Sequence, residues 1–337
     1  MRVGYNPLKD QINALSRYTH QVVIPVYIPN HEAYFKDSFA ILRLCLNSLF
    51  ATIHKKTFIT IVNNGSDIIV RNYLDSLLEK NKIQELIHTE NIGKLNAIVK
   101  GLAGNNIELV TISDSDVMFL QNWQVETMKV FTHVPNAGVV GIVPQFKMYE
   151  SYCGNILFHN FFSKKLRFIP VKDKDAMIRF YDSIGWDRTY NQDYLEFNLG
   201  IKINSEMNIL VGSGHFVATY RKNMFEEIPS YFGYKMGGNS ERYLDELPLK
   251  KDYWRVSTEG NYAYHMGNVI EDWMFEEYDQ SNRDDTIPAY NFIKKNKLGR
   301  VSYFMKNRLF VKFISVKATV KLFLKWKKLP KNMVAKY

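Results

Sequence analysis

The chain has 337 residues, of which 46% are hydrophobic and 14% aromatic, and this composition excludes a disordered protein. No stretch approaches the roughly 18 uninterrupted apolar residues of a membrane-spanning helix, and residues 1–21 lack the apolar core of a secretion signal. Cys45 and Cys153 lie in apolar surroundings without the spacing of a zinc site, so we expect buried thiols and a cytoplasmic protein.

Short apolar runs with strand character alternate with longer helical patterns over the first third of the chain. Strands are predicted at 21–28, 58–62, 83–89 and 108–112, and helices at 39–53, 69–80 and 95–102. Alternation in steps of this length indicates a parallel sheet with right-handed crossovers. Ligands bind such sheets at the carboxyl ends of the strands, where this chain has polar clusters at 63–67, 91–96 and 113–116.

Asp114-Ser115-Asp116 directly follows the last of these predicted strands. Residues two apart in an extended chain point to the same side, so Asp114 and Asp116 can share one pocket. Two carboxylates at that separation repel each other unless one is protonated or a positive charge lies between them. A divalent cation with oxygen ligands is the usual solution, and a solvated loop with two unrelated acids is the alternative.

The net charge of +10 arises from the end of the chain. Residues 286–337 hold 14 of the 44 Lys and Arg residues and no acid, whereas the first 285 hold the other 30 together with all 34 acids. The tail also has a helical apolar stripe and basic residues on another side, which suit an anionic membrane surface. We expect contact with such a surface through residues 300–328, and a helix packed on the rest of the protein is the alternative. The stripe comprises Leu309, Phe313, Val316, Val320 and Phe323, and the basic side comprises Lys317, Lys321, Lys325 and Lys328.

An ordered set of segments resembles a family 2 glycosyltransferase with the GT-A fold. The segments are VVIPVYIPN at 22–30, ITIVNNGSD at 59–67, NIGKLNAIVKGL at 91–102 and ISDSDVMFLQNW at 112–123, with weaker matches at 211–228, 243–257 and 262–268. The resemblance implies an α/β fold with a Rossmann-like, mainly parallel central sheet flanked by helices. It divides the chain into a lead-in at 1–20, a nucleotide-sugar-binding half at 21–125, an acceptor-binding half at 126–285 and a basic helical tail at 286–337.

The resemblance implies an enzyme that moves a hexosyl group from a nucleotide-diphosphate sugar to a glycan or lipid-linked acceptor with inversion. In the family, the last Asp of the DxD motif binds Mn²⁺ or Mg²⁺, which here is Asp116. The first Asp, here Asp114, faces the nucleoside and is also counted as a metal ligand, and a late histidine, here His265, completes the metal site. The metal stabilises the charge that develops on the diphosphate leaving group.

The same resemblance assigns the nucleotide sugar to nine residues of the first half. They are Pro25, Val26, Asn63, Asn64, Lys94, Asn96, Ser113, Asp114 and Ser115. Family members commonly have Asp where this chain has Asn63-Asn64, and Asn donates as well as accepts hydrogen bonds. A UDP-sugar is therefore expected by resemblance, while a GDP-sugar stays open. Lys94 is expected to meet phosphate, and a solvated lysine at the start of a helix is the alternative.

Inverting transfer also requires a base that takes the proton of the acceptor hydroxyl. The resemblance places it ahead of Tyr253-Trp254, where Asp245 is preferred, Glu241 is the alternative and Glu246 is a third candidate. An acid that only favours a helix dipole is the structural alternative. The turn Gly212-Ser213-Gly214-His215 is expected near the acceptor.

Two other classes of protein stay open from the sequence. The Asn63-Asn64 pair and the missing Glu-Asp pair permit a catalytically degenerate GT-A binding or scaffold protein. The basic tail permits a nucleic-acid-binding protein, although zinc spacings and RNP motifs are missing. We therefore expect a glycosyltransferase and no nucleic-acid partner.

Overall fold

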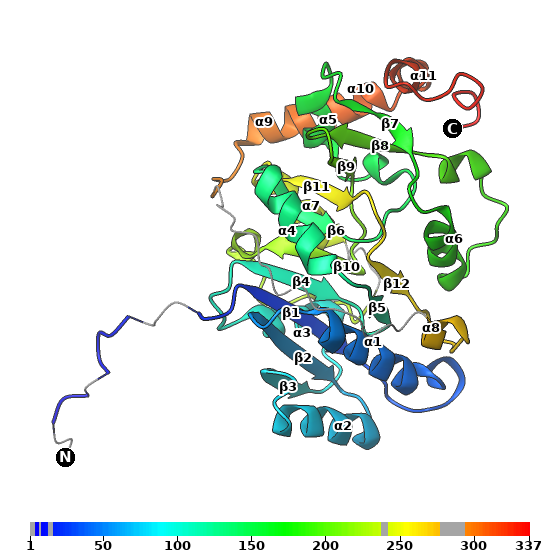
Figure 1. Ribbon diagram of the computed structural model, residues 1–337. Coiled ribbons are helices and arrows are strands. Elements are labelled where there is room, and N and C mark those ends of the chain that lie inside the picture. The colour runs from blue at the N-terminus through cyan, green and yellow to red at the C-terminus, as the bar shows by residue number, and fades with distance from the viewer. Residues whose placement is uncertain (1–3, 7, 13–15, 237–241, 277–293) are drawn as a thin grey trace.

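The computed structural model describes residues 4–6, 8–12, 16–236, 242–276 and 294–337. Within these ranges ten strands form one mixed sheet, and two more, β5 (Val117–Phe119) and β12 (Ala263–His265), form a separate ribbon (Figure 1). The order across the sheet is β3 (Glu85–Thr89), β2 (Thr57–Asn64), β1 (His20–Val26), β4 (Leu109–Ser113), β10 (Val217–Arg221), β6 (Ala137–Gly141), β11 (Trp254–Thr258), β9 (Asn208–Val211), β8 (Phe197–Lys202) and β7 (Leu166–Pro170).

The first four strands are parallel, as the alternating pattern predicts. β1 pairs in parallel with β2 and β4, and β2 pairs in parallel with β3. They are connected through α1 (Ser38–Thr52), α2 (Ile68–Glu79) and α3 (Lys94–Leu102). Alternate residues of β1 serve opposite faces: Val22 and Ile24 pack with α1 and α2, whereas Val23 packs with α3. The predicted boundaries of these seven elements all lie within two residues of the observed ones.

The second half of the sheet departs from the parallel arrangement. β10 runs antiparallel to both β4 and β6, β6 is parallel to β11, and β9, β8 and β7 are antiparallel to their neighbours. One sheet therefore runs through both predicted halves and confirms the Rossmann-like α/β class. The flanking helices are α4 (Trp123–His133), α5 (Gly154–Asn160), α6 (Lys174–Ser183), α7 (Arg242–Lys250) and α8 (Trp273–Glu276), with 3₁₀ turns at Ala33–Phe35, Met148–Glu150, Gln192–Leu195 and Lys222–Phe225.

The basic tail packs on the domain along the edge that holds α5 and β7 (Figure 1). It comprises α9 (Arg300–Phe304), a π-helical turn η5 (Met305–Leu309), α10 (Phe310–Ile314) and α11 (Lys317–Trp326). The predicted single apolar stripe is wrong, because Val316 has extended backbone angles and separates two helices. Phe323 is buried in the core while Phe313 is half-exposed.

Two further expectations concern thiols and membranes. Cys45 and Cys153 are buried and unpaired, as predicted. In the part of the chain that the structure describes, every helix is too short or too polar to cross a bilayer.

Candidate active site

Two loops meet at the carboxyl end of β4. Val217, the first residue of β10, pairs with Ser113, the last residue of β4. The Asp114 amide donates to the Phe216 carbonyl at 2.7 Å. The predicted acceptor turn at 212–215 therefore leads directly into the strand beside the Asp114-Ser115-Asp116 loop.

A two-stranded ribbon brings Asp116 and His265 together from distant parts of the sequence. β5 (Val117–Phe119) follows Asp116, and β12 (Ala263–His265) ends at His265. Val117 pairs with His265, and the Met266 amide donates to the Asp116 carbonyl at 2.8 Å. As a result, His265 Nε2 lies 3.5 Å from Asp116 Oδ2.

The environment of Asp116 suits a cation. Its Oδ1 atom is buried and has no hydrogen-bond partner among the described residues. Burial raises the pKa of the Asp116 carboxyl, and the charge of Asp114 adds to this rise while His265 acts against it. A divalent ion would satisfy the orphaned oxygen and remove the penalty of a buried carboxylate.

Ser183 holds the second ring nitrogen of His265. The Ser183 hydroxyl donates to the Phe180 carbonyl at 2.7 Å and lies 2.9 Å from His265 Nδ1, from which we infer that Nδ1 carries the proton of the neutral ring. In the neutral ring, Nε2 then presents a lone pair to Asp116. The rings of Phe180 and Phe216 flank the imidazole edge-on, with centroids 6.2 and 5.3 Å away. This arrangement, a second ring nitrogen held by an outer partner, is typical of histidine metal ligands.

Asp114 has a different partner. Lys94 Nζ lies 2.7 Å from Asp114 Oδ1 and 2.9 Å from Oδ2, and both side chains are about one fifth exposed. Lys94 is the first residue of α3, and its amide donates to the Lys235 carbonyl. Of the three predicted metal ligands, only Asp116 and His265 face each other. Among the described residues, no three His, Cys, Asp or Glu side chains gather closely enough to hold a metal by themselves.

Most other predicted nucleotide contacts support the loops from within. Asn63 is buried, binds His88 Nδ1 at 2.9 Å and accepts from the Ser66 amide. Asn64 accepts from the Ile92 amide at 3.0 Å. Asn96 exchanges two hydrogen bonds with the backbone of Phe232, and its amide also donates to Ile92. The side chains of Val26 and Ser113 are buried, whereas Pro25 and Ser115 are partly exposed.

Asp245 is held by an arginine that the sequence did not single out. Arg255 is 2% exposed and donates to Asp245 Oδ1 at 2.7 Å, to the Ser151 carbonyl at 3.0 Å and to the Ser213 carbonyl. His215 Nδ1 lies 3.7 Å from the other oxygen of Asp245. The preferred base is therefore tied to the predicted acceptor turn. Burial raises the pKa of Tyr220, and the charges of Asp245 and Asp114 raise it further.

The acceptor turn itself depends on its glycines. Gly212 has φ = 102°, and a Cβ there would lie 2.6 Å from Met148. A Cβ at Gly214 would lie 2.5 Å from Gln145 Nε2. Ser213 is fully buried, so the turn is tightly packed. Glu241, the alternative base, lies outside the described residues.

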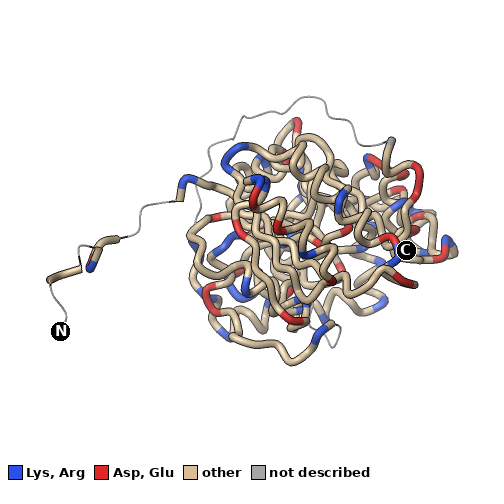
Figure 2. The backbone as a smooth tube through the Cα atoms, turned by 90° about the horizontal axis from the view of Figure 1, so that it is seen from below, with Lys and Arg blue, Asp and Glu red and all other residues tan. Residues whose placement is uncertain are grey.

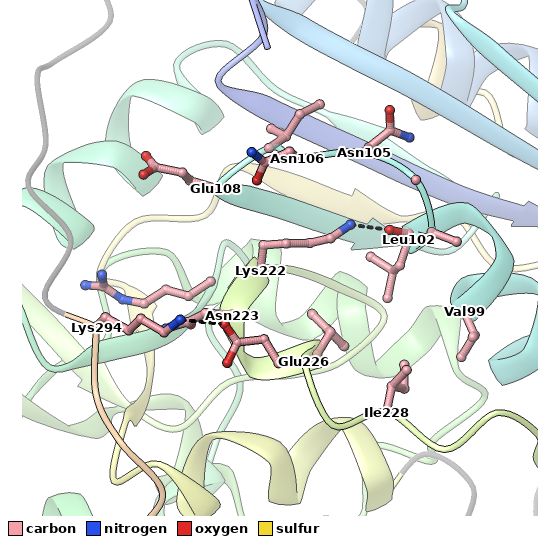
Figure 3. Close-up of a pocket in the computed structure, with 15 residues that line it drawn as sticks. Val99, Leu102, Asn105, Asn106, Glu108, Lys222, Asn223, Glu226, Ile228 and Lys294 are labelled. Atoms are coloured by element: carbon pink, nitrogen blue, oxygen red, sulfur yellow. Dashed lines mark hydrogen bonds and ion pairs between the residues drawn. The ribbon is translucent and has the colours of Figure 1, made fainter. Parts of the chain in front are cut away.

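A cavity of about 730 Å³ lies at the opposite end of β4 and β10 (Figure 3). Its lining includes Leu102, Glu108, Lys222, Glu226 and Lys294. Burial lowers the pKa of Lys222 to about 8, and Lys222 donates to the Leu102 carbonyl. Lys294 pairs with Glu226 at 2.9 Å. The cavity contains neither Asp116 nor His265. We therefore place the candidate active site at the carboxyl end of β4, where these two side chains face each other.

Comparisons with known proteins identify the family of the chain. The family model described as Glycosyl transferase family 2 matches residues 21–227, more than half of the chain and including Asp114 and Asp116. No curated protein matches. Among solved structures, the chain is similar to "Crystal structure of S. aureus TarS 1-349", with a TM-score of 0.41 and 14% identity over 74% of this chain and 60% of that chain. It is also similar to "Crystal structure of S. aureus TarS", with a TM-score of 0.41 and 13% identity over 77% of this chain and 38% of that chain.

The chain thus spans less than two thirds of the length of either solved structure. The family match is the finding that assigns the chain, because it covers four parallel strands and the Asp114-Ser115-Asp116 loop. The protein belongs to glycosyl transferase family 2 and is a glycosyltransferase.

Proposed function

We propose that the enzyme transfers a sugar from a nucleotide-diphosphate sugar to a hydroxyl group of a glycan or lipid-linked acceptor, with inversion and with Mn²⁺ or Mg²⁺. UDP is the favoured nucleotide and GDP the second. One observation carries the proposal: Asp116 and His265 face each other beside the Lys94–Asp114 ion pair, at the carboxyl end of β4.

The metal would be held by Asp116 and His265, with its other positions left to diphosphate oxygens and water. Mg²⁺ and Mn²⁺ suit this arrangement because they retain waters and bind substrate phosphates. When bound, the ion supplies Lewis-acid stabilisation of the leaving diphosphate. Asp116 supplies the orphaned oxygen Oδ1, and Ser183 keeps the Nε2 lone pair of His265 available.

Asp114 and Lys94 would bind the nucleotide rather than the metal. The ammonium group of Lys94 holds one oxygen of Asp114 at 2.7 Å, and a carboxylate accepts hydrogen bonds from ribose hydroxyls. The same ammonium group adds positive charge beside the position proposed for the diphosphate. Lys94 and Asp114 therefore orient the nucleotide.

Asp245 would act as the base. Arg255 holds one of its oxygens at 2.7 Å and fixes the side chain, while the other oxygen stays on the side of His215. A base must be positioned before it is useful, because proton transfer requires hydrogen-bond distance to the acceptor hydroxyl. Arg255 is thus proposed as a positioning residue.

The direct test is nucleotide-binding calorimetry combined with a transfer assay on a panel of UDP- and GDP-sugars. We expect Mn²⁺ to strengthen UDP binding to the wild type, and we expect Asp116→Ala and His265→Ala to abolish that Mn²⁺ effect. Asp175→Ala, at an exposed acid in the first turn of α6, is the matched control and should behave as the wild type. Mn²⁺ enhancement that survives in Asp116→Ala would refute the proposed site.

A further inference from the structure

The tail presents a second apolar stripe that the fold does not use. Its inner side chains pack on the domain, including Phe310 against Phe161 and the buried Phe323 and Leu324. The same segment also carries eight large apolar side chains that are each at least 43% exposed: Val301, Phe304, Met305, Leu309, Phe313, Val316, Leu322 and Trp326. We call this exposed surface of residues 300–328 the tail face.

The tail face continues onto the neighbouring helix. Phe162, which follows α5, is 85% exposed, and its ring lies 5.9 Å from Trp326. Phe158, on α5 itself, is 41% exposed, and its ring lies 5.2 Å from Phe310. Exposed apolar side chains gathered in this number on one segment indicate an interaction site, because monomeric proteins rarely leave so many uncovered together.

The charge on the tail face has one sign. Residues 294–337 contain no acid. Seven exposed basic residues lie among the apolar ones, namely Arg300, Arg308, Lys312, Lys317, Lys321, Lys325 and Lys328. Within the described structure, the ion pairs of the tail use Lys294, Lys297 and Lys306 and none of these seven. Elsewhere, acids and bases lie among one another, as the view from below shows (Figure 2).

The tail face is held firmly in place. Lys306 pairs with Asp252 at 2.6 Å, and Lys327 donates to the carbonyls of Phe161 and Ser163. Gly154 lets η5 approach closely, because a Cβ there would lie 2.7 Å from the Lys306 carbonyl oxygen. The exposed side chains are therefore displayed on a docked scaffold.

We propose that the tail face binds the surface of an anionic lipid bilayer. Its apolar side chains would enter the boundary between head groups and acyl chains, and its basic residues would meet lipid phosphates. A second copy of the same face is disfavoured because it would oppose seven cations with seven more. RNA would satisfy the cations but leave the exposed Phe, Leu and Val side chains in water. This inference does not rest on the proposed donor, metal or base.

The test is co-sedimentation of the full chain with vesicles of phosphatidylcholine, alone or with about 30% phosphatidylglycerol, in about 0.1 M NaCl. We expect binding only to the anionic vesicles. Each lysine near such a surface strengthens binding roughly fivefold, so Lys317→Gln/Lys321→Gln/Lys325→Gln should weaken it roughly 100-fold. The matched control is Lys80→Gln/Lys82→Gln/Lys100→Gln, which removes three exposed charges elsewhere and should bind as the wild type.

A second pair of variants tests the apolar contribution. Phe304→Ser/Phe313→Ser should weaken vesicle binding at least tenfold, because both rings are half-exposed and would lose their insertion. Ile68→Ser/Ile69→Ser, at exposed positions on α2, should leave binding unchanged. Circular dichroism confirms that each variant is folded.

Three results would overturn the inference. They are no binding to anionic vesicles, equal weakening by the control variants, and a tail face that instead joins two copies of the chain or binds RNA. Dimerisation is read by light scattering, and RNA binding is read by filter retention. Nucleotide binding, measured in parallel, should be the same in all variants, so failure here is distinguishable from failure of the proposed function.

Discussion

Asparagine in place of Asp245 separates the chemistry of this carboxylate from its structural role. The side-chain oxygen of asparagine still accepts the hydrogen bond from Arg255, which now spans 2.7 Å. An amide, however, cannot take a proton from an acceptor hydroxyl. We therefore expect the transfer rate of Asp245→Asn to fall at least about 100-fold, with UDP affinity unchanged within about twofold.

The stability cost of the same substitution is smaller than that of removing Arg255. Arg255 is 2% exposed, and Arg255→Met would leave Asp245 without its cation and two carbonyls without their donor. Breaking a buried pair from one side costs about 3–5 kcal/mol. Asp245→Asn keeps the hydrogen bond but removes the counter-charge of Arg255, and it should cost about 1.5–3 kcal/mol. Urea unfolding of both variants and the double variant measures these free energies.

The combination of assays decides the role. If Asp245→Asn is folded and retains more than a tenth of the transfer rate, Asp245 is not the base, and Glu241→Gln is the next variant to measure. If Arg255→Met costs less than about 1 kcal/mol, the positioning argument fails because the pair contributes no structural constraint.

Three further outcomes are expected. Ser183→Ala should weaken Mn²⁺ affinity about 10- to 100-fold in a metal titration. The control Ser205→Ala, at an exposed serine, should leave the affinity unchanged. Equal Mn²⁺ affinities of the two variants would exclude Ser183 as a positioning residue. Burial acts to raise the pKa of Asp252, but hydrogen bonds from His159 and Lys306 lower it from 3.8 to about 2. Its stabilisation is therefore complete above about pH 4 and is lost as the pH falls toward 2, by roughly 2 kcal/mol in total. Unfolding titrations of Asp252→Asn should lack this component, and an identical pH dependence would contradict the assignment. Gly154→Ala should lower the free energy of unfolding in urea by about 1–3 kcal/mol, because its Cβ would lie 2.6 Å from the Val311 side chain. The control Gly104→Ala has open space around its Cβ but a φ of 77°, so it should show only the smaller cost of backbone strain. Equal costs for the two variants would reject the packing argument.

The parallel half of the sheet was predictable because its signals are local. Each strand is a short apolar run, and the first three are each followed by a helix with its own apolar spacing. Asp67 illustrates the agreement, since it caps α2 by accepting from the Val70 amide at 2.9 Å. The polar clusters then follow the strands at one edge, which is why Asp114 and Asp116 were recognisable from the sequence.

The rest depends on contacts between distant segments. Arg255 lies in an ordinary strand pattern, and no local signal indicates that it holds Asp245 and the 212–215 turn. Ser183 ends α6 and has no motif around it. The prediction of a single apolar stripe in the tail failed for a different reason. The segment from α9 to α10 has both partly buried and exposed apolar residues, and periodicity does not reveal which of them face the domain.

The two acids of the DxD motif have opposite electrostatic partners, and this difference accounts for their separate proposed roles. Lys94 neutralises Asp114, so its carboxylate is satisfied without a metal. Asp116, whose side chain is 31% exposed, lies 3.5 Å from His265 Nε2 and has one oxygen without a hydrogen-bond partner among the described residues, so its carboxylate is left for a cation. One net negative charge from the protein leaves a divalent ion one positive charge in excess. That excess is available to the diphosphate, where negative charge develops as the sugar departs.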